Sequence, residues 1–500
     1  MGVHEANSGA ESRGCDSGGL KLNTSASLRF RFYRGLMRVF SFLVLNRLRL
    51  RRVEGLARLL DFHDKNGEIC PSSQGSLSQG SLKENADAEN DRAGLSRAMK
   101  CTVWLHGASL GELESLWGLA ERLSSGGFSL VLTCSSPSGL PGIKKLSEEI
   151  CANGFRSSIL FSGLAPIEGS WCEALARFKT RLFVTVKYEA WPELWGSLSE
   201  GKVPLLLIGA RKRSSLQIVR TLLKALGMEL PQLFFALVRE EEREPLEILF
   251  GSSPVFRVTG DPRWDRVQQR QRTKHARLEV VLEKLGALDK PWGVLGNIWA
   301  SDFRVLEEAL QSPFQGTLWF VPHDISTTSL DQIETRLSAL ATHHQIDWIR
   351  TSSLRKESGS SLKIGQQALD KSLVRMVLVD EMGFLSELYR HAAWAYVGGG
   401  FQAGVHSAIE PAMSLIPIAI GPKRALSFSE VHLLADSGQL SICSSTGEVT
   451  DWYTRIKKEK NPIILEEQRR RWSLRIDSQM DATHRLADWV YEILQDGIQK

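Results

Sequence analysis

The ten residues HGASLGELES (106–115) contain the first carboxylate whose position in the sequence suggests chemistry. Glu112 follows an apolar run and opens a helical pattern. Ser109 and Glu112 have the S-x-x-E spacing of a capping box, in which the Glu112 carboxylate accepts a hydrogen bond from the Ser109 N–H. Alternatively, a carboxylate at the end of a buried strand can take a proton from a substrate hydroxyl. Taken alone, the stretch favours the helix cap.

Two further charged residues stand in similar positions. Glu189 in VKYEAWPELW follows an apolar run, and Arg211 in IGARKRS follows the next one. A cation such as Arg211 can stabilise the negative charge that develops on a leaving group. The alternative is a structural ion pair of Glu189 with Lys187 or Arg211. We expect Trp191 and Trp195 to pack in the core.

The segment 377–422 has the pattern of a nucleotide-binding loop. An apolar run ends at Asp380, a second one ends in three glycines, and HSAIEP then opens a helix. Glycines let backbone N–H groups approach a phosphate, and a helix N-terminus adds a favourable dipole. Glu410 can accept hydrogen bonds from ribose hydroxyls. The alternative is structural, because Gly-rich turns close many βα units.

The sequence predicts neither a metal site nor a cofactor. The seven cysteines are scattered without CxxC or Cys/His spacing, which favours reduced thiols. Neither G-x-x-x-x-G-K-[ST] nor D-x-D occurs, which disfavours P-loop enzymes and metal-dependent glycosyltransferases. His106 and His323 have no partner at ligand spacing, so we expect hydrogen-bonding loop residues there.

From residue 100 on, short apolar runs alternate with amphipathic stretches such as 112–123, a pattern typical of parallel sheets covered by helices. The expected strands contain TVWLHG, SLVLTC, RLFVTV and PLLLIG, and in a second series WGVLGN, LWFVPH, MVLVD, WAYVGGG and IPIAIGP. Each ends in Gly, His, Pro or a polar residue, where open α/β sheets bind ligands. The predicted fold class is therefore α/β, with two Rossmann-like domains facing a cleft.

The predicted domain boundaries follow the composition of the chain. Residues 62–98, rich in Ser, Gly, Asn, Asp and Glu, read as a disordered linker. The remaining parts are a basic N-terminal segment (1–61), a first Rossmann-like domain (99–270), a charged interdomain linker (271–290), a second Rossmann-like domain (291–465) and a C-terminal helix (466–500) that packs back onto the first domain.

The basic character of the chain belongs to its N-terminal segment. Residues 21–53 hold eight Arg and one Lys without an acid, whereas the rest of the chain carries 53 basic and 57 acidic residues. This distribution disfavours nucleic-acid binding. The longest uncharged run, 39–46, is too short to cross a bilayer, so we expect a helix that lies on an anionic membrane surface. The alternative is an Arg-rich organellar targeting segment.

The motifs together resemble the family of 3-deoxy-D-manno-octulosonic acid (Kdo) transferases, which attach Kdo to lipid A. The family's D-x-M-G element, Gly-rich loop and H-N-x-x-E-P are matched by residues 380–383, the triple Gly and residues 406–411. The blocks WLHGASLGELE, LTCSSPSG, VKYEAWPELW, IGARKRS, VTGDPRWDRV, GNIWASD, WFVPHDIS and SFSE are similar to further family motifs in order and spacing. The resemblance covers about residues 100–450.

The resemblance implies an inverting, metal-independent glycosyltransferase of GT-B architecture, acting at the cytoplasmic face of a cell inner membrane as a peripheral or monotopic protein. It implies transfer of Kdo from the donor CMP-Kdo to a lipid A precursor, lipid IVA, as the acceptor. Glu112 matches the general base, and Glu189 and Arg211 match positions that support the transition state. The segments that would bind the CMP of the donor are matched by Pro322, His323, Met382, Gly383, Phe384, Ser407, Ala408, Ile409 and Glu410.

The chain also departs from the family pattern. Ser407 replaces the usual Asn after His406, Phe384 stands where Glu is frequent, Gly209 where Asn is frequent, and His323 where many members have Arg. Two alternatives therefore remain: a glycolipid GT-B enzyme that uses a UDP- or GDP-sugar, and a non-catalytic membrane-bound homologue. If Glu112 is the base, its carboxylate is expected to face the interdomain cleft and not Ser109.

Overall fold

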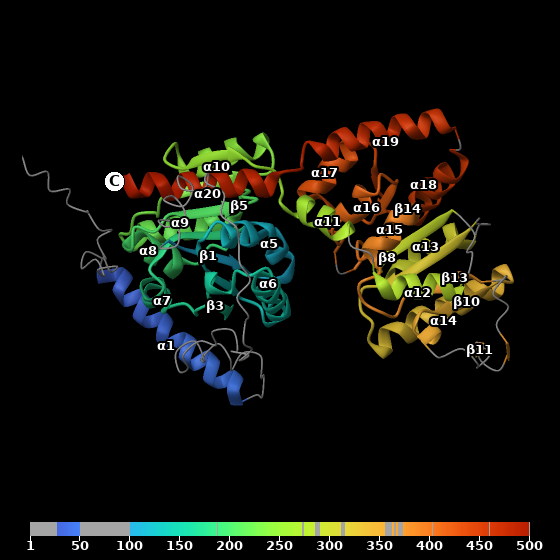
Figure 1. Cartoon of the computed structure of the whole chain (residues 1–500), viewed down its shortest axis with the longest axis horizontal. Helices are drawn as coiled ribbons and strands as arrows, with labels where there is room; N and C mark the ends of the chain where they lie inside the picture. The colour runs from blue at the N-terminus through green and yellow to red at the C-terminus, as the bar shows by residue number, and fades with distance from the viewer. Residues whose placement is uncertain are drawn as a thin grey trace, which may run out of the picture. The chain divides into compact units, whose positions relative to one another are not determined.

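The computed structural model describes residues 28–50, 101–187, 189–272, 275–285, 291–311, 316–355, 363–364, 367–368, 374–402, 404–459 and 461–499. The chain divides into two compact units (Figure 1). The first is Met1–Asp261 with Thr483–Lys500, and the second is Pro262–Ala482. The predicted linker 62–98 lies outside the described residues.

The first unit is built on a seven-stranded parallel sheet with the order β3-β2-β1-β4-β5-β6-β7. All six residues of β1 are buried, and alternate side chains enter different cores: Val103 and Leu105 pack on one face and Trp104 on the other. The strands are β1 (Thr102–Gly107), β2 (Ser129–Cys134), β3 (Ile159–Leu164), β4 (Thr180–Val186), β5 (Leu205–Ile208), β6 (Leu233–Leu237) and β7 (Val255–Val258). The covering helices are α5 (Leu110–Ser125), α6 (Leu140–Ala152), α7 (Trp171–Arg177), α8 (Pro192–Glu200), α9 (Ser214–Ala225), α10 (Arg243–Phe250) and α20 (Ala482–Gln499).

The second unit contains another seven-stranded parallel sheet, with the order β10-β13-β9-β8-β14-β15-β16. Val294 and Leu295 of β8 again enter different cores. The strands are β8 (Trp292–Ile298), β9 (Thr317–Pro322), β10 (Asp347–Arg350), β13 (Val374–Leu378), β14 (Ala392–Val397), β15 (Ile418–Ile420) and β16 (Leu440–Ile442), besides the small pair β11 (Lys363–Ile364) and β12 (Gln367–Ala368). The helices are α11 (Arg263–Gln271), α12 (Ala276–Leu285), α13 (Phe303–Gln311), α14 (Thr327–His344), α15 (Leu385–His391), α16 (Ile409–Met413), α17 (Ser429–Asp436), α18 (Thr446–Lys458) and α19 (Pro462–Asp477).

These two sheets confirm the predicted fold class, α/β with two Rossmann-like domains, the building blocks of the GT-B glycosyltransferase architecture. In each sheet the strand order reverses at one point, between β1 and β4 in the first unit and between β8 and β14 in the second. Open α/β sheets bind their ligands at the carboxyl ends of the strands beside such a switch point.

The unit boundaries differ from the predicted ones because of helix packing. The first unit ends at Asp261 and not at 270, since Trp264 and Val267 of α11 lie in the core of the second unit. The predicted linker 271–290 contains α12, whose apolar side chains also fill that core. The predicted C-terminal helix is two helices: α19 belongs to the second unit, and α20 belongs to the first.

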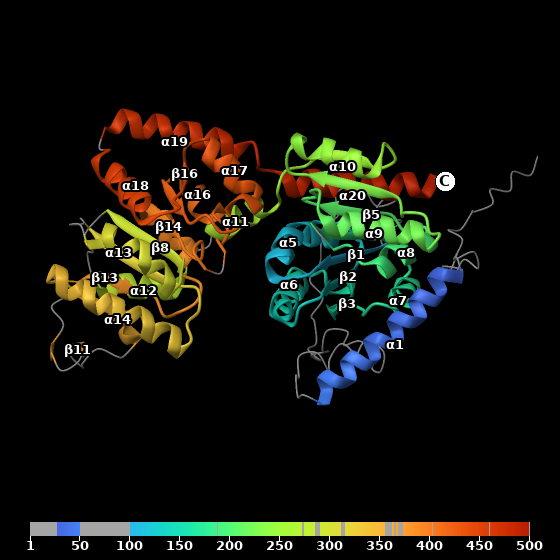
Figure 2. The ribbon, with the colours of Figure 1, turned by 180° about the vertical axis from the view of Figure 1, so that it is seen from behind.

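The N-terminal basic segment contains one helix, α1 (Leu28–Leu50). It lies beside α7 and α8 in both views of the ribbon (Figures 1 and 2), and its Phe30 is fully buried in the core of the first unit. Among the described helices, none is long and apolar enough to cross a membrane.

Candidate functional site

Glu112 lies in the first turn of α5, just after the carboxyl end of β1. Its Oε2 accepts a hydrogen bond from the Ala108 N–H at 2.6 Å, and Ser109 makes no side-chain cap. The expected capping partner is thus replaced by the residue before it. Burial and the neighbouring charge of Glu189 raise the pKa of Glu112, although the Ala108 N–H, Lys187 and His106 oppose the shift. The predicted direction of the carboxylate toward an interdomain cleft stays a prediction.

Glu189 follows β4, the neighbour of β1 at the switch point of the first sheet. Its Oε2 accepts a hydrogen bond from Trp191 Nε1 at 2.7 Å and lies 3.4 Å from His106 Nε2. Burial raises the pKa of Glu189, but the contacts with His106 and Trp191 outweigh it, and the pKa is lower than that of an ordinary glutamate. The expected ion pair of Glu189 with Lys187 or Arg211 is replaced by the contact with His106.

His106 is fully buried and orients Glu189. Thr133 Oγ1 accepts a hydrogen bond from Trp104 Nε1 at 2.8 Å and lies 2.9 Å from His106 Nδ1. The Thr133 hydroxyl therefore suits donation to Nδ1, which leaves the Nε2–H for Glu189. Ser135 Oγ lies 3.1 Å from the same Nε2. The sequence predicted a hydrogen-bonding histidine here but not its partner, which is 83 residues away.

The two carboxylates therefore have pKa values displaced in opposite directions, upward for Glu112 and downward for Glu189. Such a divergence between neighbouring groups is typical of acid–base sites. The indole N–H of Trp191 contributes to the lowered pKa of Glu189 by donating to its carboxylate. Because 45% of Trp191 is exposed, the prediction that it packs in the core was wrong. Trp195 is buried in the core as predicted.

Arg211 lies after β5, the next strand of the same sheet. Its Nε is 3.2 Å from Glu242 Oε1. The other carboxylate oxygen of Glu242 accepts hydrogen bonds from the backbone N–H groups of Val238 and Arg239. The side chain of Arg211 is partly exposed.

In the second unit, the triple glycine closes the end of β14. A Cβ at Gly398 would lie 2.5 Å from the Asn297 carbonyl oxygen, and one at Gly400 would lie 2.5 Å from Gly421 Cα. The Gly399 N–H donates to the buried Asp302 at 3.0 Å. These glycines thus have the structural role that the sequence left as an alternative to phosphate binding.

His323 and His406 stack on each other at the same end of the sheet. Their ring centroids are 4.2 Å apart, and His323 also stacks on Trp299 at 4.8 Å. Burial lowers the pKa of both rings, that of His406 to about 4. Both are therefore neutral near pH 7, and His323 does not supply the fixed charge of the family's usual Arg. Pro322 is buried in β9.

The HSAIEP segment is held by buried charges. Ser407 Oγ donates to Glu430 Oε1 at 3.2 Å, and Arg263 pairs with both oxygens of Glu430 at 3.2 and 2.8 Å. Glu410 lies 3.7 Å from Arg270 Nη2. The side chains of Ala408 and Ile409 are buried, and α16 has only five residues.

The third donor segment contributes one exposed side chain. Met382 is 72% exposed, and Gly383 has a φ of +96°, which favours glycine. Phe384 is fully buried and packs edge-on against His275. Among the described residues, no group of three or more His, Cys, Asp or Glu is placed to hold a metal ion.

The comparisons with known proteins identify relatives of the chain. Residues 81–266 match the family model of the 3-deoxy-D-manno-octulosonic-acid transferases. The chain is 25% identical over 329 residues to the 3-deoxy-D-manno-octulosonic acid transferase of Bordetella pertussis, covering 64% of this chain and 71% of that one. The enzyme of the same name from Chlamydia pneumoniae is 25% identical over 332 residues, covering 64% and 69%.

A likeness to a solved structure supports the fold. A Listeria monocytogenes protein assigned as UDP-N-acetylglucosamine 2-epimerase superposes with a TM-score of 0.50 at 11% identity. The match covers 77% of this chain and 94% of that chain, so it extends over both α/β units.

Proposed function

We propose that this chain, a glycosyltransferase of the Kdo transferase family, transfers Kdo from CMP-Kdo to a lipid A precursor. The observation that carries the proposal is the pair Glu112 and Glu189, whose pKa values are displaced in opposite directions at the switch point of the first sheet. The two relatives are named 3-deoxy-D-manno-octulosonic acid transferases, which supports Kdo as the transferred group.

In the proposed reaction Glu112 is the general base. Its raised pKa brings its basicity closer to that needed for proton transfer from a sugar hydroxyl. As the acceptor oxygen bonds to the anomeric carbon from the face opposite the CMP, the hydroxyl proton passes to Glu112 and CMP leaves with the bonding electrons. Direct displacement inverts the anomeric configuration.

Glu189 remains ionised in this scheme, since its pKa is lowered by His106 and Trp191. A fixed anion next to Glu112 makes Glu112 more basic and also stabilises positive charge that develops on the sugar ring. Arg211, on the neighbouring strand, supplies a cation for the Kdo carboxylate or the leaving phosphate. Protein groups thus fill each role, so the reaction proceeds without a metal ion.

We place the CMP of the donor at the carboxyl ends of β9 and β14 in the second unit. The exposed ring of His323, the exposed Met382 and the hydroxyl of Ser407 offer side chains to it. Phe384, Ala408 and Ile409 have buried side chains, so they contribute through their main chains. Neutral His323 suits stacking or hydrogen bonding, and not a charge pair.

We further propose that α1 attaches the protein to the cytoplasmic face of a cell inner membrane. Leu28, Phe32, Leu36 and Val39 recur at helical spacing and are each more than half exposed. Exposed arginines, among them Arg29 and Arg31, flank this apolar stripe. A helix with this pattern suits the headgroup region of an anionic bilayer.

The test is a donor comparison with the purified full chain. Lipid IVA in detergent micelles is incubated with CMP-Kdo, a UDP-sugar or a GDP-sugar, with and without EDTA, and products are identified by mass spectrometry. We expect a Kdo-glycolipid with CMP-Kdo alone, insensitive to EDTA. Product from a nucleoside diphosphate sugar in place of CMP-Kdo contradicts the proposed donor.

A further inference from the structure

Helix α1 is held on the first unit by one face of its first three turns. Phe30 inserts between α1 and α8, where a Cβ on Gly196 would lie 2.1 Å from the phenyl Cζ. Arg38 donates to the Gly169 carbonyl and to Glu173. Arg34, between these two contacts, pairs with Glu193 at 3.1 Å and with Glu200.

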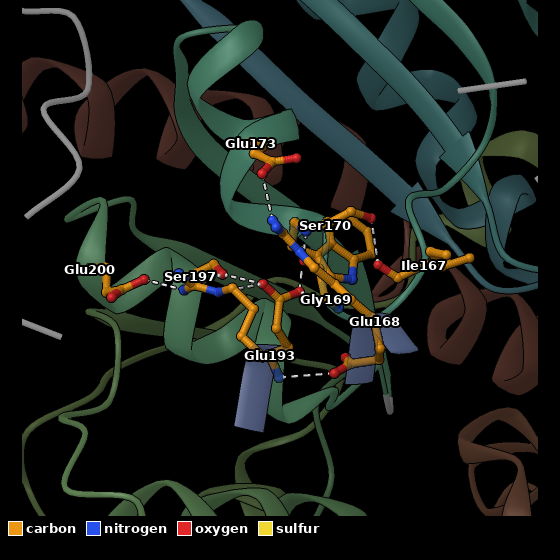
Figure 3. Close-up of polar contacts among 11 residues, drawn as sticks. Ile167, Glu168, Gly169, Ser170, Glu173, Glu193, Ser197 and Glu200 are labelled. Carbon is orange, nitrogen blue, oxygen red and sulfur yellow. Dashed lines mark hydrogen bonds and ion pairs between the residues drawn. The ribbon is translucent and has the colours of Figure 1, made fainter. Parts of the chain in front are cut away.

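Glu193 is the centre of the polar cluster under α1 (Figure 3). It is fully buried, and its Oε1 accepts from Arg34 Nε and, at 2.8 Å, from Ser197 Oγ. Its Oε2 accepts from the backbone N–H groups of Gly169 and Trp171, each at 3.1 Å. The carboxylate therefore joins α1, α7 and α8 at one point.

A second carboxylate, that of Glu168, lies next to Glu193, so this cluster needs the positive charge of Arg34. The Glu193 N–H donates to Glu168 Oε2 at 3.2 Å, and burial together with the charge of Glu193 raises the pKa of Glu168 to about 8. Removing one partner of a buried ion pair leaves an uncompensated charge, which costs more than the pair contributes. Without Arg34, either the Glu193 carboxylate takes up a proton, or the first turn of α8 and the loop before α7 rearrange.

The first turn of α8 and the loop before α7 are each connected to Glu189, one of the two proposed catalytic carboxylates. Glu193 lies four residues after Glu189, and Trp195 of the same helix donates its Nε1–H to the Glu189 carbonyl at 3.3 Å. On the other side, the Trp171 ring packs edge-on against His106 at 5.9 Å, and His106 contacts the Glu189 carboxylate. The main chain and the side chain of Glu189 are thus each connected to Glu193.

We infer that Arg34 is a positioning residue for Glu189: by fixing Glu193 it couples the seating of α1 to the geometry of the catalytic carboxylate. The inference rests on the proposed function for the role of Glu189. It assigns α1 a part in turnover that is separate from membrane attachment.

The experiment compares Arg34→Ala with Arg220→Ala in the full chain. Both variants remove one arginine of the first unit, but Arg220 is an exposed residue of α9, whereas Arg34 is paired with Glu193 and Glu200. We expect Arg34→Ala to lower kcat about ten-fold, as for a displaced catalytic group, while the KM for CMP-Kdo stays unchanged. Arg34→Lys restores part of kcat, and Arg220→Ala keeps all of it. Rates are normalised to active sites counted by CMP binding, so a loss of folded protein does not imitate the effect.

A double-mutant cycle tests the route through Glu193. If Arg34 acts through this carboxylate, Arg34→Ala with Glu193→Gln is no slower than the slower single variant. Losses that multiply in the double variant overturn the inference, as does wild-type kcat in Arg34→Ala.

Hydrogen exchange gives a readout that needs no substrate. Arg34→Ala should accelerate exchange of the amides in 189–195, and Arg220→Ala should not. Unchanged exchange in Arg34→Ala overturns the inference even if no substrate is accepted. An inactive wild type with faster exchange in Arg34→Ala would contradict the proposed function and leave the coupling through Arg34 supported.

Discussion

Glu112 and Glu189 are the same residue type in two different electrostatic surroundings. Glu112 has one backbone N–H donor and a neighbouring anion, whereas Glu189 has an indole N–H and an imidazole. These contacts separate the two pKa values, which is the basis for the roles of base and fixed anion that we propose for the two residues.

This division predicts the pH dependence of the reaction. A general base must be ionised, so kcat/KM should fall on the acid side as the pH drops through the raised pKa of Glu112. In Glu189→Gln the like charge is absent, so the pKa of Glu112 decreases and the acid limb moves to lower pH, along with a lower maximal rate. A pH–rate profile of both proteins measures the shift. An acid limb that stays in place or moves to higher pH would contradict the electrostatic coupling.

Glu168 predicts a pH dependence of stability. Its pKa is raised from 4.5 to about 8 in the folded protein, so the folded state binds the proton more tightly than the unfolded state does. The stabilisation is complete below about 4.5 and is lost as the pH rises toward about 8. Glu168→Gln, which resembles the protonated form, should flatten this dependence. Thermal unfolding across this range checks it, and parallel curves for wild type and variant would show that Glu168 is not its source.

At the scale of residues, the sequence indicated which side chains lie at the candidate site better than it indicated their hydrogen-bond partners. The S-x-x-E spacing placed Glu112 at a helix start, but the choice between the Ser109 and Ala108 N–H groups depends on how the chain leaves β1. The contact of His106 with Glu189 depends on the pairing of β1 with β4, which no local pattern encodes.

At the scale of elements, most buried strands were predicted from the sequence, but the edge strands and the buried β6 were not. TVWLHG and SLVLTC coincide with β1 and β2 because every position but one is buried and apolar runs mark them. By contrast, β3 and β7 lie at the two edges of the first sheet and are largely half-exposed, so their apolar signal is weak. The helix 112–123 was placed correctly inside α5, with the usual error at its ends.

The packing of α1 on α8 predicts the effect of one methyl group. In Gly196→Ala the added Cβ would lie 2.1 Å from Phe30, so α1 must leave its seat, whereas α8 itself gains helix propensity. Hydrogen exchange should therefore accelerate in α1 and stay slow in the sheet. Phe30→Ala in the same chain removes the clash and should restore part of the protection. A Gly196→Ala protein whose α1 remains protected would contradict this packing.

At the scale of the whole molecule, two α/β domains follow from the two series of apolar runs, but the division between them does not. Helix α20 returns to the first unit, where Leu486, Trp489 and Val490 belong to one of its cores. The amphipathic pattern of a helix indicates that one face is buried, but not which domain covers that face. The packing of α20 on the first unit was therefore expected, but the pattern alone could not establish it.

The whole chain should bind anionic vesicles in a salt-dependent manner. Each arginine near the surface contributes about 1 kcal/mol at low salt, and salt screens this attraction. Vesicle sedimentation should show strong binding to anionic lipid, weak binding to neutral lipid and a loss at high salt. Phe32→Ser with Leu36→Ser removes exposed apolar side chains and should weaken binding, whereas Ile218→Ser, an exposed position on α9, serves as the control. Equal binding of all three proteins would exclude the stripe on α1 as the membrane contact.

The central claim is that Glu112 removes the acceptor proton during Kdo transfer from CMP-Kdo. The most direct test is a single-turnover measurement of Kdo-glycolipid formation with saturating CMP-Kdo, comparing wild type with Glu112→Gln. The amide keeps the shape of the side chain but cannot take the proton, so we expect the rate to fall about 100- to 10,000-fold while CMP binding is unchanged. Full activity of Glu112→Gln, or no product from wild type, would contradict the account.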